Sequence, residues 1–243
     1  MFYYGEYLIA MFICMAISAI ASSRVRSAYG KYDKVRCRSG LTGYDAAVRL
    51  LSNNQASDIS VGKVSGMLSD HYNPARSIVN LSESTYGSSS VAAVAVAAHE
   101  IGHVMQKKDG YVPYRLRTAI VPVVNLGSRL AMPLVLIGLL LDTGVRAAGE
   151  TSLGFSLAMI GVALYGLSLL FALVTLPVEY NASRRAKQML LEEGIIAKDE
   201  MQGANAVLSA AAMTYAASLL VSLISFLRFL LYVLSVFGRR SRR

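Results

Sequence analysis

The chain has 243 residues, of which 54% are hydrophobic and only 16% are charged, and its mean hydropathy is +0.46. This composition is too apolar for a soluble domain and predicts a membrane protein. The formal net charge of +9 could indicate nucleic-acid binding, but no nucleic-acid-binding module or aromatic-basic stripe accompanies it. The basic residues lie beside apolar runs, so we expect them to set membrane topology, with a lipid bilayer and no nucleic acid as partner.

The first apolar stretch, residues 2–21, predicts a transmembrane helix. It carries Glu6 and no early Lys or Arg, whereas a cleaved signal peptide begins with positive charge. We therefore expect residues 1–22 to form a retained N-terminal anchor. The positive-inside rule then places the N-terminus outside and the basic segment that follows the anchor in the cytoplasm. That segment contains Arg24, Arg26, Lys31, Lys34, Arg36 and Arg38.

Residues 23–118 predict a folded domain of mixed α and β structure on the cytoplasmic face of the membrane. A capping-box pattern at Thr42 begins a short helix. A strand is expected over residues 58–64, DISVGKV, and a hairpin that turns at an Asn-Pro pair is expected over residues 67–83. A strand beside the next helix matters for function because an exposed sheet edge can pair with an extended peptide.

The segment AVAAHEIGHVMQ, residues 95–106, contains the motif on which the predicted function depends. His99 and His103 are four positions apart, so in a helix both imidazoles stand on one face and can bind one divalent ion. Glu100 points about 100° away around the helix axis, which suits a general base that reaches water without binding the metal. The pattern is HExxH, the signature of zinc metalloproteases.

An alternative is that the two histidines share a buried helix by chance and satisfy each other's hydrogen bonds. The Ala- and Val-rich surroundings would then leave Glu100 as a costly unpaired charge. Gly102 costs about 1 kcal/mol relative to Ala inside a helix, which a close approach of another backbone or of substrate would explain. The remaining histidine, His71, lies near the predicted turn; it either contributes to catalysis by orienting substrate or stabilising an oxyanion, or is an ordinary surface residue.

Residues 119–178 contain two apolar runs and predict a two-span transmembrane hairpin. Glu179 is the first charge after the second run, so we expect it near the membrane surface, at the level of the folded domain. This position makes Glu179 our candidate for the third metal ligand, and residues 179–204 the helix that completes the site. The alternative is that Glu179 caps a helix behind Pro177 or pairs with the arginines that follow it.

Residues 205–243 contain the last apolar stretch and end in GRRSRR. As one helix, residues 205–237 would measure about 50 Å, well beyond a hydrocarbon core of about 30 Å. A fourth span would also place the terminal arginines outside, so either the second half is re-entrant or interfacial, or the positive-inside rule fails. Tyr215 could donate a hydrogen bond to a reaction oxyanion, or could be a buried tyrosine bonded to backbone.

Several segments together resemble the YugP-type neutral zinc metallopeptidases of bacterial membranes. They are AAVAVAAHE with HEIGH, VPYRLRTAIVPVVNLGS, LPVEYNASRRA, SAYGKYDKVRCRSGLTGYDAA and SDHYNPARSIVNLSE. More distantly, the chain is similar to membrane gluzincins of the CAAX-prenyl-protease and HtpX type, in which a glutamate that opens an ExxAD helix completes HExxH.

The resemblance implies that His99, His103 and Glu179 are zinc ligands and that Glu100 is the general base. Ser183 stands where the distant relatives carry Asp. The support that this Asp gives to a ligand must therefore come from elsewhere in this chain, from Asn181 or from Ser183 itself.

The predicted fold is a mostly α membrane protein with several transmembrane helices and a small α+β, zincin-like domain whose short sheet lies beside the HExxH helix. The predicted function is that of a zinc-dependent membrane metalloendopeptidase with one Zn²⁺ ion. In this mechanism Glu100 takes a proton as water attacks the scissile carbonyl and then passes it to the leaving amine.

We expect an integral protein of the bacterial plasma membrane whose active site faces the cytoplasm and whose substrates are membrane or membrane-proximal proteins or peptides. Two other classes stay open. One is an inactive zinc-binding membrane adaptor, and the other is a transporter that uses intramembrane polar residues such as Arg129 as a pathway. The sequence predicts no oligomeric state.

Overall fold

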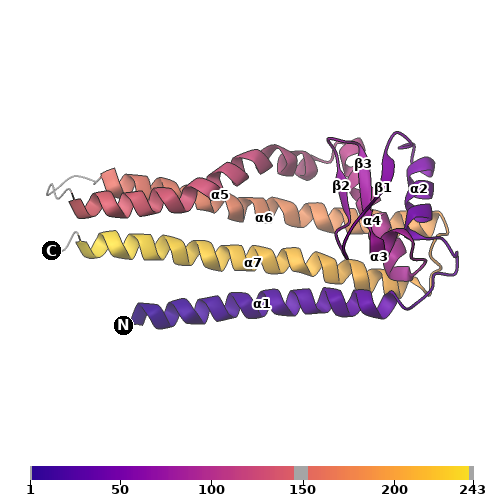
Figure 1. Cartoon of the computed structure of the whole chain (residues 1–243), viewed down its shortest axis with the longest axis horizontal. Coiled ribbons are helices and arrows are strands. Elements are labelled where there is room, and N and C mark those ends of the chain that lie inside the picture. Colours follow the sequence, from indigo (N-terminus) through magenta and orange to yellow (C-terminus); the bar gives the residue numbers. More distant parts are fainter. Residues whose placement is uncertain (1, 145–152, 241–243) are drawn as a thin grey trace. The chain divides into compact units, whose positions relative to one another are not determined.

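A computed structural model describes residues 2–144 and 153–240 of the chain (Figure 1). Within these ranges the protein is mostly helical and has one small sheet, which confirms the predicted fold class. The chain forms two compact units. The helical unit comprises Met1–Ser18, Leu116–Thr175 and Ala217–Arg243, and the site unit comprises Ala19–Arg115 and Leu176–Ala216.

Among the described residues, four helices are long and apolar enough to cross a membrane, which confirms that this is a membrane protein. They are α1 (Phe2–Tyr32), α5 (Val112–Gly144), α6 (Leu153–Glu192) and α7 (Met201–Arg240). In the helical unit, α5 and α6 approach closely at glycines. A Cβ built on Gly161 would lie 2.6 Å from the Ala131 carbonyl oxygen, so only glycine permits this contact.

The continuity of the long helices rules out one account of Glu179 and one account of the last apolar stretch. Pro177 lies inside α6, and the helix runs through it to Glu192, so the account in which Glu179 caps a helix start is wrong. Likewise, α7 is one uninterrupted helix from Met201 to Arg240, so no re-entrant turn forms in the last apolar stretch. Its Ala- and Leu-rich sequence holds no proline that would end it.

The site unit contains the sheet and three shorter helices beside segments of the long ones. These elements are α2 (Gly43–Asn53), β1 (Ser60–Val64), β2 (His71–Asn73), β3 (Ile78–Ser82), α3 (Glu83–Tyr86) and α4 (Val91–Lys108). The strand order is β1-β3-β2, with β1 parallel and β2 antiparallel to β3. The predicted hairpin is therefore confirmed, and Tyr72 pairs with Val79 in its register.

Local sequence signals start the helices that pack around the site. Thr42 and Asp45 form the predicted capping box of α2, in which the Asp45 amide donates to Thr42 Oγ1 at 3.1 Å. Ser90 caps α4, because its Oγ accepts from the Ala93 amide at 3.1 Å. Helix α4 is buried along nearly its whole length, and its Ala and Val side chains join the main hydrophobic core of the site unit with α2 and the sheet.

Candidate metal centre

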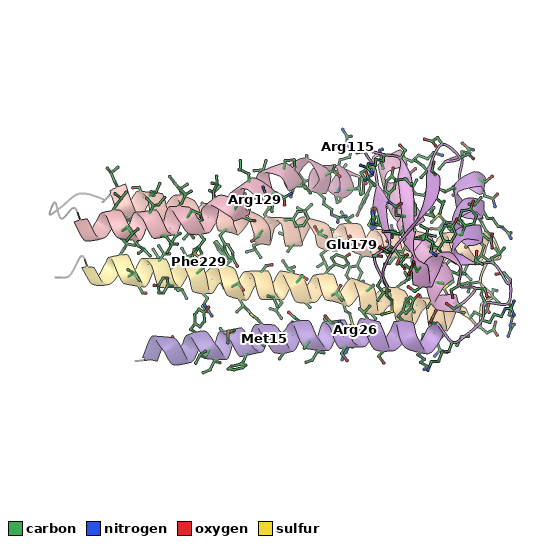
Figure 2. All side chains as sticks on the ribbon, in the orientation of Figure 1. Met15, Arg26, Arg115, Arg129, Glu179 and Phe229 are labelled. Atoms are coloured by element: carbon green, nitrogen blue, oxygen red, sulfur yellow. The ribbon has the colours of Figure 1, made fainter. Side chains whose placement is uncertain are left out.

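Two histidines of α4 and one glutamate of α6 come together in the site unit. The Nε2 atom of His99 lies 3.2 Å from Glu179 Oε2, and the Nε2 atom of His103 lies 3.4 Å from the same oxygen. One possible ligand atom from each residue lies within 4.8 Å of the others, and the structure describes no other such group of His, Cys, Asp and Glu. Figure 2 labels Glu179 on α6. The three residues singled out as ligands are thus neighbours in space.

The spacing of these atoms fits zinc. Ligand atoms about 2.0–2.2 Å from a tetrahedral zinc ion lie about 3.3–3.6 Å from one another. The two distances to Glu179 Oε2, 3.2 and 3.4 Å, are close to that separation, and all three ligand atoms lie within 4.8 Å of one another. Two imidazoles and one carboxylate are also a donor set that catalytic zinc uses, with a fourth position left for water. The residues present therefore fit one zinc ion.

The close approach of α4 to α6 depends on Gly102. A Cβ built at this position would lie 2.5 Å from the Ala182 carbonyl oxygen, well inside van der Waals contact with backbone. The close backbone approach that the sequence offered as a reason for this mid-helix glycine is thus confirmed. The glycine lies between the two histidines in sequence and sets how near they come to Glu179.

We expect Gly102→Ala to weaken zinc binding and to abolish peptide cleavage, because α4 and α6 would have to separate around the new methyl group. The matched control is Gly30→Ala in α1, since a Cβ built on Gly30 meets nothing within 4 Å. Metal content and zinc affinity of the purified proteins measure the effect. Zinc affinity in Gly102→Ala equal to that in Gly30→Ala would show that the close approach is not required.

The Glu179 carboxylate makes the ligand group favourable for positive charge. Burial by itself lowers the pKa of His103, but the hydrogen bond and charge of Glu179, with the charge of Glu100, outweigh burial and raise this pKa above its ordinary value. Glu179 is only 1% exposed. A buried carboxylate that stabilises a proton between imidazoles can also stabilise a divalent cation there.

Each imidazole has a second polar partner on the side away from Glu179. Ser183 Oγ lies 3.2 Å from His99 Nδ1, so this serine supports a ligand from the position where the distant relatives carry Asp. Gln106 Oε1 lies 3.0 Å from His103 Nδ1. The sequence motif did not single out Gln106, because glutamine three positions after a histidine is no recognised metal pattern. Its signal is polarity within a buried, Ala- and Val-rich helix.

Glu100 differs from Glu179 in having no such partners. Its side chain lies outside the ligand group, and among the described residues it makes no hydrogen bond or ion pair, although the residue is only 7% exposed. Neither oxygen of its carboxylate is among the fully buried side-chain atoms without a partner, so the carboxylate reaches solvent although most of the residue is covered. A carboxylate that must accept a proton from a reactant needs an oxygen that no other hydrogen bond occupies.

The other two residues singled out from the sequence lie outside the ligand group. His71 is exposed on β2, with Nδ1 2.9 Å from the Ser69 carbonyl oxygen and Nε2 3.1 Å from Asn80 Nδ2. Tyr215 is half-buried on α7. Their catalytic roles stay predictions. A different tyrosine, Tyr114, packs near the site with its ring centroid 6.3 Å from that of His103, and the sequence motifs did not indicate it.

Comparison with known proteins agrees with this geometry. A family model described as "Putative neutral zinc metallopeptidase" matches residues 7–234, which include all three ligand candidates. The chain is similar to "Putative membrane protease YugP" of Bacillus subtilis (strain 168), with 43% identity over 230 residues that cover 93% of this chain and 97% of the relative. No solved structure matches the chain.

Proposed function

The chain belongs to the neutral zinc metallopeptidase family and is a membrane protein. We propose that it is an endopeptidase that hydrolyses peptide bonds of membrane or membrane-proximal proteins. In this proposal it uses one zinc ion, held by His99, His103 and Glu179. One observation carries the proposal. Two imidazoles of α4 each lie 3.2–3.4 Å from one carboxylate oxygen of α6, close to the separation of ligand atoms around tetrahedral zinc, and all three ligand atoms lie within 4.8 Å of one another.

A bound zinc ion supplies Lewis acidity, which lowers the pKa of water toward 7 and polarises the scissile carbonyl. Glu100 is the general base of the proposal: its carboxylate takes the proton that water gives up on attacking the carbonyl carbon. Glu100 then gives this proton to the nitrogen of the departing amine, which completes cleavage of the amide bond. The Glu100 carboxylate reaches solvent and makes no hydrogen bond or ion pair among the described residues, so it is free to accept a proton from water, which favours this role over that of an inactive adaptor.

The sheet suggests how substrate is held. In the order β1-β3-β2, strand β2 is an edge and lies beside α4 in the site unit (Figure 1). An extended peptide can add to such an edge through backbone hydrogen bonds and bring its carbonyl to the metal helix. We therefore propose that unfolded or extended segments are the substrates.

The basic residues after α1 support a site on the cytoplasmic face of the plasma membrane. The exposed residue Gln188 on α6 offers a position to test this orientation. A cysteine placed there, in a chain without its two native cysteines, should react with a membrane-impermeant thiol reagent only after cells are opened. Labelling of intact cells would place the site on the outer face.

Removal of the metal tests the activity directly. The protein in lipid vesicles is given one peptide in two forms, free and fused to a transmembrane anchor, before and after chelation. We expect chelation to abolish cleavage, zinc to restore it, and the anchored peptide to have the higher kcat/KM. Cleavage that survives complete zinc removal would contradict the proposed chemistry. Equal kcat/KM for both peptides would contradict the proposed substrate class.

A further inference from the structure

We propose that a chain of polar side chains between α4 and α6 fixes the tautomer and ring orientation of His103, with Gln106, Asn181 and Arg185 as positioning residues of the metal centre. The inference rests on the proposed function, since it concerns the readiness of the same site to bind zinc. It adds residues that touch neither the ion nor the substrate.

The carbonyl of Val178 fixes which end of the Gln106 amide faces His103. This carbonyl can only accept a hydrogen bond, and it lies 2.7 Å from Gln106 Nε2. The amide nitrogen must therefore face α6, and Oε1 must face His103 Nδ1 at 3.0 Å. An amide oxygen only accepts, so Nδ1 carries the proton. The lone pair of neutral His103 is then on Nε2, the atom 3.4 Å from Glu179 Oε2.

Arg185 fixes the orientation of the next side-chain amide, that of Asn181. Its Nε–H group can only donate, and it donates to Asn181 Oδ1 at 2.9 Å. The same oxygen accepts from Gln106 Nε2 at 3.0 Å. Both amides thus have one permitted orientation. Each hydrogen bond along the path from Arg185 through Asn181 and Gln106 to His103 therefore has a defined donor.

The series of polar side chains leads back to α4 at its other end. Arg185 pairs through Nη1 with Asp109, the residue that caps the C-terminus of α4. The polar chain therefore joins α4 to α6 at two places, at Gln106 and at Asp109. Because α4 carries both histidines and α6 carries the glutamate, this double connection also holds the ligands in register.

His99 provides an internal comparison. Its second partner is the Ser183 hydroxyl, which can donate or accept and so does not by itself define a tautomer. Gln106, in contrast, is fully buried and is held by two further acceptors. The geometry thus assigns the stronger orienting role to the partner of His103.

Zinc affinity measured by competition with a chelator of known affinity tests the proposal and needs no peptide cleavage. We expect Gln106→Met, which keeps the length of the side chain but removes its polar atoms, to weaken zinc binding about 10–100-fold. The matched control is Gln188→Met, since Gln188 is exposed on α6 and bonds only Glu192 among the described residues. At saturating zinc, the peptide KM of Gln106→Met should equal that of wild type.

Asn181 supplies a second pair of variants that separates positioning from packing. Asn181→Asp keeps an oxygen that can accept from both Gln106 and Arg185, so we expect near wild-type zinc affinity. Asn181→Leu keeps the bulk and loses the acceptor, so we expect weaker zinc binding. If Asn181 acts through Gln106, Asn181→Leu should cost little further affinity in the Gln106→Met background.

The outcomes distinguish this inference from the proposed function. If wild type binds no zinc, both fail. If wild type binds zinc and Gln106→Met binds it equally tightly, only the positioning role is overturned. Equal losses of zinc affinity in Asn181→Asp and Asn181→Leu would also overturn it, as would fully additive losses when Asn181→Leu is combined with Gln106→Met. A loss of zinc affinity in Asn181→Leu alone, which is not additive with that of Gln106→Met, supports it.

Discussion

Replacing Glu100 with glutamine should leave zinc bound and slow peptide cleavage by about 10²–10⁴-fold, the usual contribution of a general base. Glutamine keeps the shape of the side chain but cannot take a proton from water. Since Glu100 lies outside the ligand group and makes no hydrogen bond or ion pair in the described part of the chain, its exchange should disturb neither the metal nor the packing.

Zinc content and kcat, measured on the same preparation, check this expectation. Glu192→Gln is the matched control, because Glu192 is exposed at the end of α6 and bonds only to Gln188 among the described residues. Cleavage by Glu100→Gln at more than about a tenth of the wild-type rate would remove Glu100 as the base. Wild-type protein with full zinc and no cleavage of any peptide would favour the adaptor.

Replacing Glu179 with glutamine should have the opposite pattern, because zinc itself should be lost. The neutral amide of glutamine is a poor ligand for a dication. The Glu179 carboxylate also supplies the only negative charge in the ligand group. Loss of a residue that only hydrogen-bonds a metal ligand typically weakens metal binding about 10–100-fold. We expect zinc affinity to fall by more than this in Glu179→Gln. Cleavage should fall with it and return in part only at high zinc concentration.

Metal analysis after dialysis, together with competition titration, measures this loss. Glu192→Gln again serves as the control, and the thermal unfolding of metal-free proteins shows whether the buried substitution has damaged the fold. Full zinc stoichiometry and unchanged affinity in Glu179→Gln would place the third ligand elsewhere. Taken together, the two glutamine variants separate the residue that holds the metal from the residue that moves the proton.

Much of the local structure follows from short-range patterns. The capping box at Thr42 starts α2, and the Asn-Pro pair lies between the strands of the hairpin. These predictions succeed because helix caps and turns depend on residues within a few positions of one another. The spacing of His99 and His103 belongs to the same class, since helical periodicity alone places them on one face.

Patterns that proline influences are less certain when only the sequence is known. Pro177 made a helix start beside Glu179 plausible, yet α6 runs through it without a break. Inside a membrane helix, neighbouring groups can satisfy the carbonyl that proline leaves unpaired, so proline does not have to end the helix. The last apolar stretch is likewise a single helix, α7, although its length exceeds one bilayer crossing.

The sequence by itself determined the membrane character, the HExxH helix and the candidate ligand that follows the third apolar run. Only the tertiary structure decided that Glu179 meets His99, from which it is 80 positions away, that Gly102 lies against the Ala182 backbone, and that Gln106 supports His103. Periodicity and capping are encoded by near neighbours. Contacts between α4 and α6 depend instead on how side chains of two separate helices pack, which no local pattern specifies.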